Sequence, residues 1–172
     1  MKIKVFLWYL QKGVTLTKDN LAKRRWNGSK RCVFCAQDET IKHLFFECHY
    51  AHFIWRAVQV TFGLSIPSSF SHIFYDWLDG YSIKLKMLIL SGVAALCWSL
   101  WLSRNDLVFE KCSPKTYMQV LYRGTYWCRC WVQLQRHEEN KTMMIEACRN
   151  LETVVMEIFA KFGWHYSYRI SM

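Results

Sequence analysis

Cys32-Val33-Phe34-Cys35, followed by His43 and Cys48, is the stretch that decides how the first third of this chain folds. Two residues separate the first two cysteines, seven precede the histidine, and four more precede the last cysteine. Three thiols and one imidazole can complete the tetrahedral shell of one Zn²⁺. We expect Cys32, Cys35, His43 and Cys48 to bind one structural zinc ion. The alternative is that these residues occur in this order by chance within a core.

The residues between these ligands suit a metal site. Ala36-Gln37-Asp38-Glu39 is polar and turn-like, as a loop between ligands should be. Thr40 is a candidate N-cap for a short helix, which would place His43 in its first turn and Cys48 near its end. His49 and His52 flank the last ligand and could replace or orient one, although solvated positions are the simpler expectation for both.

Several multi-residue signatures surround the ligands. They are Lys2–Trp8 (KIKVFLW), Leu16–Leu21 (LTKDNL), Trp26, His43–Cys48 (HLFFEC), Ala51 with Trp55, and later Trp98, Trp101, Arg104, Asn105, Phe109 and Glu110. These segments resemble the zinc-binding region of plant non-LTR (LINE-type) reverse transcriptases and the segment that follows it. In that family the region lies downstream of the polymerase, so the resemblance implies a nucleic-acid role for the parent polyprotein.

Catalytic signatures of that family are absent from the sequence. The chain has neither the Tyr/Phe-Ala-Asp-Asp metal site of the polymerase nor the spaced carboxylates of an RNase H. It also lacks a glycine-rich phosphate loop, G-x-S-x-G and H-E-x-x-H. We therefore expect a non-enzymatic, freestanding fragment of such a reading frame, with no small-molecule substrate.

Charge is concentrated near the N-terminus. The net charge is +10, and residues 1–31 hold nine Lys or Arg against the single acid Asp19, a net +8. Such a cluster beside a zinc site is what phosphate binding requires, whereas the simpler explanation is a solvated helix face. The candidate residues for contact with RNA or DNA are Lys18, Lys23, Arg24, Arg25, Trp26, Lys30 and Arg31. Trp26 or Phe34 would stack on unpaired bases.

Composition bounds the class and the compartment. Apolar residues make up 52% of the 172 residues, which is enough for a buried core. Eight cysteines without a secretory signal indicate a reducing, intracellular location, with nucleus or cytoplasm expected. A basic, nearly acid-free first 26 residues leaves mitochondrial import as an alternative. Cys128 and Cys130 could form a second soft metal site, but no partners for them are evident.

Periodicity predicts a mostly α-helical protein. Short N-terminal helices would surround the zinc site, and a bundle of about three long helices would follow. The expected helices cover residues 3–11, 17–25, 49–62, 82–110, about 113–136 from Ser113-Pro114, and 141–162, while residues 164–170 alternate weakly. The expected domains are residues 1–63, a linker with a short helix at 64–81, and an aromatic-rich bundle at 82–172.

One predicted helix is apolar enough to raise the question of a membrane. Met87 to Ser103 is an uncharged run of 17 residues, slightly short of the roughly 20 that a span needs. A buried central helix is the favoured interpretation, with Arg104-Asn105-Asp106 marking where it reaches the surface.

Two functional hypotheses follow. The first is a zinc module that binds nucleic acid through its basic N-terminal region. The second is a protein-interaction module, a regulatory, toxic or interfering factor, that docks a partner or a second copy through aromatic helical surface. Salt separates them, because phosphate binding weakens steeply with ionic strength whereas apolar docking does not.

Overall fold

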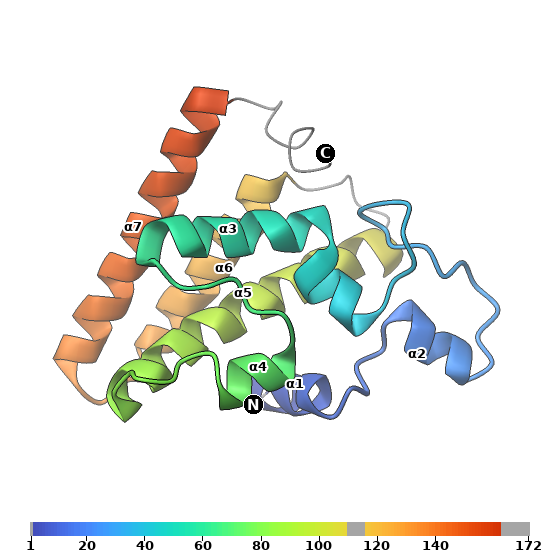
Figure 1. Cartoon of the computed structure of the whole chain (residues 1–172), viewed down its shortest axis with the longest axis horizontal. Helices are drawn as coiled ribbons and strands as arrows, with labels where there is room; N and C mark the ends of the chain where they lie inside the picture. The colour runs from blue at the N-terminus through green and yellow to red at the C-terminus, as the bar shows by residue number, and fades with distance from the viewer. Residues whose placement is uncertain (1, 110–115, 163–172) are drawn as a thin grey trace.

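The computed structural model describes residues 2–109 and 116–162, and it confirms a mostly helical fold (Figure 1). Within these ranges there is no strand, only one isolated bridge between Arg31 and Asp38. The elements are α1 (Lys2–Gln11), α2 (Lys18–Lys23), the π-helical turn η1 (His43–Glu47), α3 (His49–Phe62), α4 (Phe70–Tyr75), α5 (Ile83–Phe109), α6 (Tyr117–Val132) and α7 (Glu138–Phe162).

Glycines follow helices α1 and α3, whose last residues agree with the predicted ranges 3–11 and 49–62. Gly13, just beyond α1, and Gly63, at the end of α3, both have a φ of +68°, which side chains with a Cβ rarely adopt. The backbone N–H of Gly63 donates to the carbonyl of Gln59 at 2.8 Å, so the turn also satisfies a terminal carbonyl of α3.

Other helix boundaries differ from prediction. The second helix ends at Lys23 rather than Arg25, because Arg25 has a left-handed φ of +64°. Helix α7 begins at Glu138, three residues before the expected Lys141. Helix α6 begins after Thr116, which forms a capping box with Gln119. The predicted Ser113-Pro114 start and the weak alternation at 164–170 lie outside the described residues.

Helix α5 is the central element of the molecule. It packs against α1, α3, α6, α7 and η1 (Figure 1). Phe6 of α1 meets Trp98 of α5 edge to face, with ring centroids 5.0 Å apart. One hydrophobic cluster combines Phe6, Phe45, Trp55, Trp77, Leu100, Leu121 and Val155, which come from all three predicted segments. The three-part division remains a prediction.

The segment between α3 and α5 packs into this core. Leu64, Phe70 and Trp77 are buried, and the indole N–H of Trp77 donates to the carbonyl of Ser65 at 2.7 Å. The short helix expected within 64–81 is α4. Part of the predicted linker at 64–81 is therefore packed against the core.

Arg104 corrects one prediction. We expected it to mark the surface end of the long apolar helix, but its side chain is only 1% exposed. Its guanidinium forms a buried ion pair with Glu39, with Nη2 and Oε1 2.7 Å apart. A buried charge is stable only with such a partner, so the polar residue that ends the apolar run points inward.

Helix α5 is also the one described helix that is long and apolar enough to cross a membrane, judged by length and composition. Buried core helices of soluble proteins meet the same criterion, and 44% of the residues in its most apolar window are buried here. Whether the chain contacts a membrane remains a prediction, with packing against α1, α3, α6 and α7 favouring the core role.

Candidate metal centre

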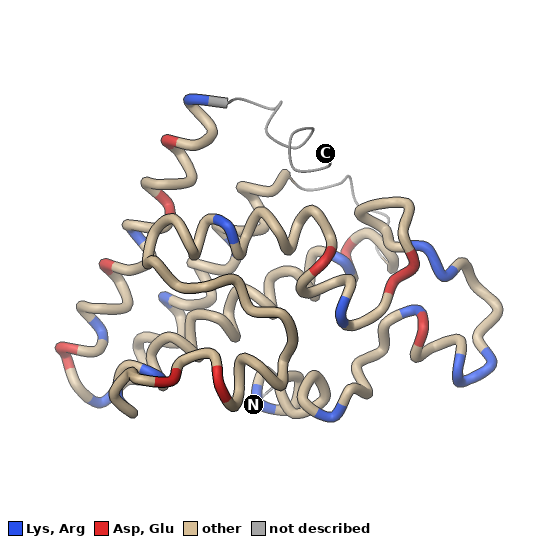
Figure 2. The backbone as a smooth tube through the Cα atoms, in the orientation of Figure 1, with Lys and Arg blue, Asp and Glu red and all other residues tan. Residues whose placement is uncertain are grey.

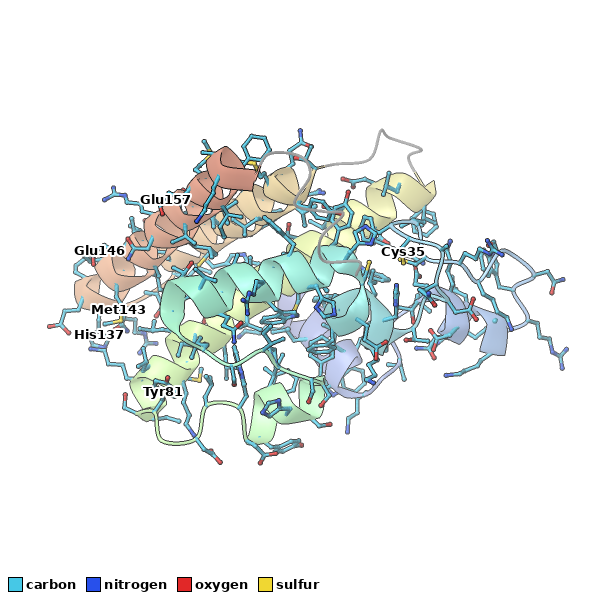
Figure 3. All side chains as sticks on the ribbon, turned by 45° about the horizontal axis from the view of Figure 1, so that its top comes forward. Cys35, Tyr81, His137, Met143, Glu146 and Glu157 are labelled. Atoms are coloured by element: carbon cyan, nitrogen blue, oxygen red, sulfur yellow. The ribbon has the colours of Figure 1, made fainter. Side chains whose placement is uncertain are left out.

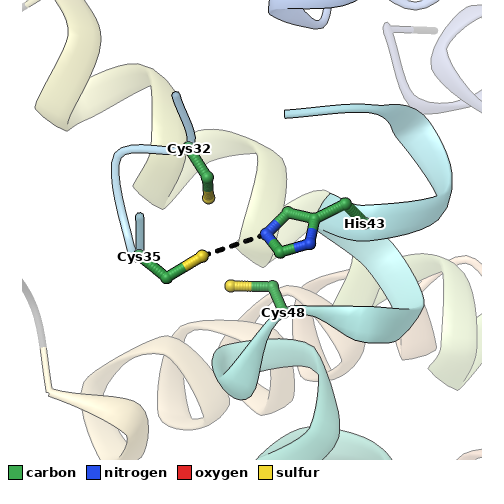
Figure 4. A group of neighbouring side chains, drawn as sticks. All are labelled: Cys32, Cys35, His43 and Cys48. Atoms are coloured by element: carbon green, nitrogen blue, oxygen red, sulfur yellow. Dashed lines mark hydrogen bonds between the residues drawn. The ribbon is translucent and has the colours of Figure 1, made fainter. Parts of the chain in front are cut away.

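The four predicted ligands converge on one point (Figure 4). Their ligand atoms all lie within 4.8 Å of one another, and Cys35 Sγ is 3.1 Å from His43 Nε2. Cys32, His43 and Cys48 are buried, whereas Cys35 is partly exposed. Ligand atoms about 2.0–2.3 Å from a tetrahedral zinc lie roughly 3.3–3.8 Å apart, so a zinc ion fits with small adjustments.

A tight loop holds the first two ligands. The N–H of Cys32 donates to the carbonyl of Gln37 at 2.8 Å, which closes the loop behind the metal side. The N–H of Phe34 points at Cys32 Sγ, 3.4 Å away, and such a bond favours a thiolate. The polar turn predicted between Cys35 and Thr40 is therefore a closed loop whose inner face presents sulfur.

A π-helical turn positions the last two ligands. In an α-helix, residues five apart point about 140° away from each other. Here the N–H of Cys48 donates to the carbonyl of His43 at 2.7 Å, which widens the turn and brings both side chains to the same side. Thr40 caps this segment as predicted, since its hydroxyl accepts from the N–H of His43 at 2.9 Å. The π turn itself was not predicted, although the spacing of four between His43 and Cys48 was its signal.

The electrostatics of the cluster call for a cation. A hydrogen bond from Cys48 lowers the pKa of Cys32 to about 4, whereas the bond to Cys32 raises the pKa of Cys48. Burial raises the pKa of Cys35, and a hydrogen bond with Cys32 raises that of His43. Without a cation the cluster therefore favours a single thiolate. A divalent ion offsets the repulsion between neighbouring thiolates, so it stabilises all three thiolates and the neutral imidazole together.

The other candidate ligands lie apart from this group. His49 packs its ring against Tyr50 and Tyr117, at centroid distances of 5.1 and 5.7 Å, and His52 is exposed. Cys128 is buried while Cys130 is exposed, so they do not face one site. Among the described residues, Cys32, Cys35, His43 and Cys48 form the one group of at least three potential ligands.

A buried carboxylate links the metal loop to α5. Glu39 receives Arg104 Nε at 3.1 Å and Nη2 at 2.7 Å, and also the backbone N–H of Lys18 at 3.0 Å. The N–H of Glu39 itself donates to the carbonyl of Lys30 at 2.8 Å. The sequence analysis did not predict this ion pair, although a glutamate inside the ligand loop and an arginine at the end of an apolar helix were its two signals.

The predicted cations gather on the loop that follows α2 (Figure 2). Arg24, Arg25, Lys30 and Arg31 are exposed, and Lys23 is exposed while it contacts Asn20 Oδ1 at 2.8 Å. We call residues 23–31 the basic loop. Lys18 is different, because it is buried and its Nζ donates to the carbonyl of Arg31 at 2.6 Å. Lys18 thus braces the basic loop, which is at odds with its predicted place among phosphate contacts.

Trp26 is positioned by its neighbours in the basic loop. Its ring lies so close to Gly28 that a Cβ added there would be 1.9 Å from the ring. The residue is 39% exposed, so part of its surface remains open to a ligand. Phe34, the other predicted stacking residue, is already stacked on Tyr50 with centroids 4.3 Å apart. Trp26 is therefore the better of the two stacking candidates.

The comparisons with known proteins agree with this site. Residues 1–55 match the family model described as zinc-binding in reverse transcriptase. No curated protein and no solved structure matches the chain. The matched range contains all four residues of the cluster, and both observations indicate one structural zinc ion. Residues 1–55 thus carry the features of a reverse-transcriptase zinc-binding region.

Proposed function

We propose that this chain is a non-enzymatic module, derived from a LINE-type polyprotein, that binds RNA or DNA through the basic loop. The observation that carries the proposal is the grouping of five exposed cations and Trp26 on a loop whose base is fixed by Glu39 and Lys18. A reducing intracellular location, nucleus or cytoplasm, is consistent with three zinc-binding thiols.

Phosphate contacts would supply most of the affinity. Each neutralised phosphate releases counterions, so the five cations predict a slope of about −3 to −4 in log K against log salt for a single strand. Trp26 would add base stacking, which is worth about 1–3 kcal/mol per base and tolerates any sequence.

The non-enzymatic part of the proposal comes from the zinc shell. Four protein ligands occupy a tetrahedral ion completely, so no position remains for a substrate or an activated water. The zinc would then contribute folding free energy to the loop that carries the cations.

Charge removal tests the proposal. Arg24→Gln with Arg25→Gln should weaken binding to a fluorescent single strand and reduce the magnitude of the salt slope by about 1.4. Arg136→Gln with Arg149→Gln removes the same charge from exposed positions elsewhere and serves as the matched control. Equal losses in both double variants would mean that only net charge matters, and the loop assignment would be wrong.

Two variants test Trp26 in different ways. Trp26→Ala removes the ring, whereas Gly28→Ala keeps it but forces it away with the added methyl. Both should weaken single-strand binding while leaving the salt slope unchanged, because no phosphate contact is lost. Tyr126→Ala, at a 60% exposed residue on α6, is the aromatic control and should bind normally.

A second candidate function has one observation in its favour. Helix α1 exposes Val5, Trp8 and Tyr9 at 45%, 53% and 43%, which is an apolar surface suited to a protein partner or a second copy. Sedimentation and pull-down experiments at low and high salt would distinguish the two functions. Association that persists at high salt, with no strand binding, would favour the protein-interaction module.

A further inference from the structure

A recess lies beside the basic loop. It has a volume of about 370 Å³, which falls within the range of about 300–1,000 Å³ typical of small-molecule sites. Residues of helix α1, of the segment after it, of the basic loop and of the later part of α5 line it. The residues used below are Phe6, Tyr9, Thr15, Arg24, Trp98 and Trp101. We call this recess the α1–α5 pocket.

Aromatic rings form much of the wall of the α1–α5 pocket. Phe6 packs edge to face on Trp98, and its centroid is 6.0 Å from that of Trp101. The guanidinium of Arg104 sits 5.1 Å from the Trp101 centroid, which helps to fix that ring. Tyr9 is 43% exposed and lies in the wall as well. The wall therefore offers preorganised aromatic surface to a ligand.

Two polar residues of the pocket, Thr15 and Arg24, indicate which kind of ligand it would bind. Thr15 lines it, is 3% exposed, and its hydroxyl has no hydrogen-bond partner. Buried hydroxyls are normally paired, and this oxygen has almost no accessible surface, so a ligand in the pocket would pair with it once the side chain turns toward the pocket. The other two such atoms among the described residues belong to Ser103 and Asn140, neither of which lines the pocket. Arg24, a residue of the basic loop, lines the same pocket and supplies positive charge.

We propose that the α1–α5 pocket holds one unpaired nucleobase of a strand bound along the basic loop. Tyr9 and Trp98 would contact the base, Thr15 would hydrogen-bond its edge, and Arg24 would hold the adjacent phosphate. An apolar ligand would leave Thr15 and Arg24 unused, and a duplex could not present an extruded base without unpairing. This inference rests on the proposed nucleic-acid function and adds the substrate class: single-stranded RNA or DNA.

Thr15→Val is the decisive variant, because it removes the hydroxyl while keeping the shape of the side chain. An unpaired buried hydroxyl does not stabilise the fold, so the melting temperature should be unchanged or higher. Affinity for a fluorescein-labelled single strand of about twelve nucleotides should fall about three- to tenfold at constant salt, with the salt slope unchanged. Tyr9→Ala should weaken binding similarly, whereas Tyr126→Ala should not.

Ligand variants complete the test. Binding of the wild-type protein should be weaker to a strand of abasic residues and to a duplex than to the intact strand. Direct binding of AMP is measured as well: AMP binding that Thr15→Val abolishes, with normal strand binding by the same variant, would assign the pocket to a free nucleotide rather than a strand base. Normal strand binding by both Thr15→Val and Tyr9→Ala would overturn the pocket while leaving the proposed function standing. No strand binding by the wild-type protein would overturn both.

Discussion

The buried pair of Arg104 and Glu39 shows how much of this fold depends on single residues. Both side chains are at most 1% exposed and are joined by three contacts of 2.7–3.3 Å. A buried pair adds little net stability compared with apolar residues, but breaking it leaves an uncompensated charge in the interior. The pair also joins the metal loop to α5, so its loss should destabilise both of them.

Arg104→Met should therefore destabilise the protein by about 3–5 kcal/mol in urea unfolding. Glu39→Gln combined with Arg104→Met should recover part of this loss, because the amide is neutral and can still accept from the N–H of Lys18. Arg149→Met, at an exposed position on α7, is the control and should change stability by less than about 0.5 kcal/mol. A similarly small effect of Arg104→Met would contradict the role assigned to the pair.

Replacing a zinc ligand should affect the protein far more than replacing a cysteine outside the cluster. Cys35→Ser and His43→Ala should each lose bound zinc and lower the melting temperature, because the ion contributes folding free energy. Cys128→Ser removes a buried thiol that lies outside the cluster, so it should retain one zinc per chain and unfold only slightly earlier. Metal analysis of the purified variants with thermal unfolding checks this, and equal stability of all three would refute the zinc assignment.

At the scale of elements, replacing Gly92 or Gly63 by alanine should change the stability of the protein in opposite directions. Gly92 lies inside α5 beside a cavity of about 400 Å³, and an added Cβ would meet nothing within 4 Å. This cavity is also lined by Tyr81 and Met143, which Figure 3 places at the end of the molecule opposite Cys35. Gly63 instead ends α3 with a φ of +68°.

Gly92→Ala should stabilise the protein by about 0.5–1 kcal/mol, since alanine is the better helix former and no neighbour must move. Gly63→Ala should destabilise it by about 1 kcal/mol, because a Cβ is strained at positive φ. Denaturant midpoints measure both changes. A loss of stability in Gly92→Ala would mean that the space beside α5 is filled in solution.

Helices α6 and α7 are joined by a two-pronged ion pair. Arg129 contacts both carboxylate oxygens of Glu152, at 2.6 and 2.7 Å. Burial alone would raise the pKa of Glu152, but hydrogen bonds from Arg129 and Thr125 outweigh it, and the pKa is lowered. The stabilisation is therefore complete above the unfolded pKa of about 4.3 and is lost as the pH falls through the lower folded value.

Glu152→Gln should consequently cost stability at pH 7 and less as the pH falls below about 4. The measurement is the difference in free energy of unfolding between wild type and variant across this range, which cancels protonation of the zinc ligands. Glu157→Gln, an exposed substitution on the same helix, is the control. A difference that does not change with pH would show that the pair does not depend on ionised Glu152.

At the scale of the molecule, the zinc region and the helices share one core. Phe45, Trp55, Leu100 and Val155 belong to the same hydrophobic cluster, although they span most of the described sequence. The family match ends at residue 55, well before α5, whose packing against α1 and η1 completes this core. Loss of the metal should therefore also destabilise helices that lie beyond the matched region.

Chelation of zinc should lower amide protection in α5 as well as around the ligands, because Arg104 and Trp98 lose the surfaces on which they pack. Hydrogen exchange with and without a chelator measures this residue range by residue range. Exposure confined to residues 2–63, with α5 fully protected, would show instead that the two parts fold independently.

The chemistry of short-range patterns was sufficient for much of this protein. Ligand types and spacing predicted the zinc set, and apolar periodicity predicted the long helices, because each depends on residues close in sequence. The tertiary structure alone revealed the π turn, the inward position of Arg104 and the bracing role of Lys18. The last two depend on the distant partners Glu39 and Arg31, and no local pattern states which distant group will compensate a buried charge.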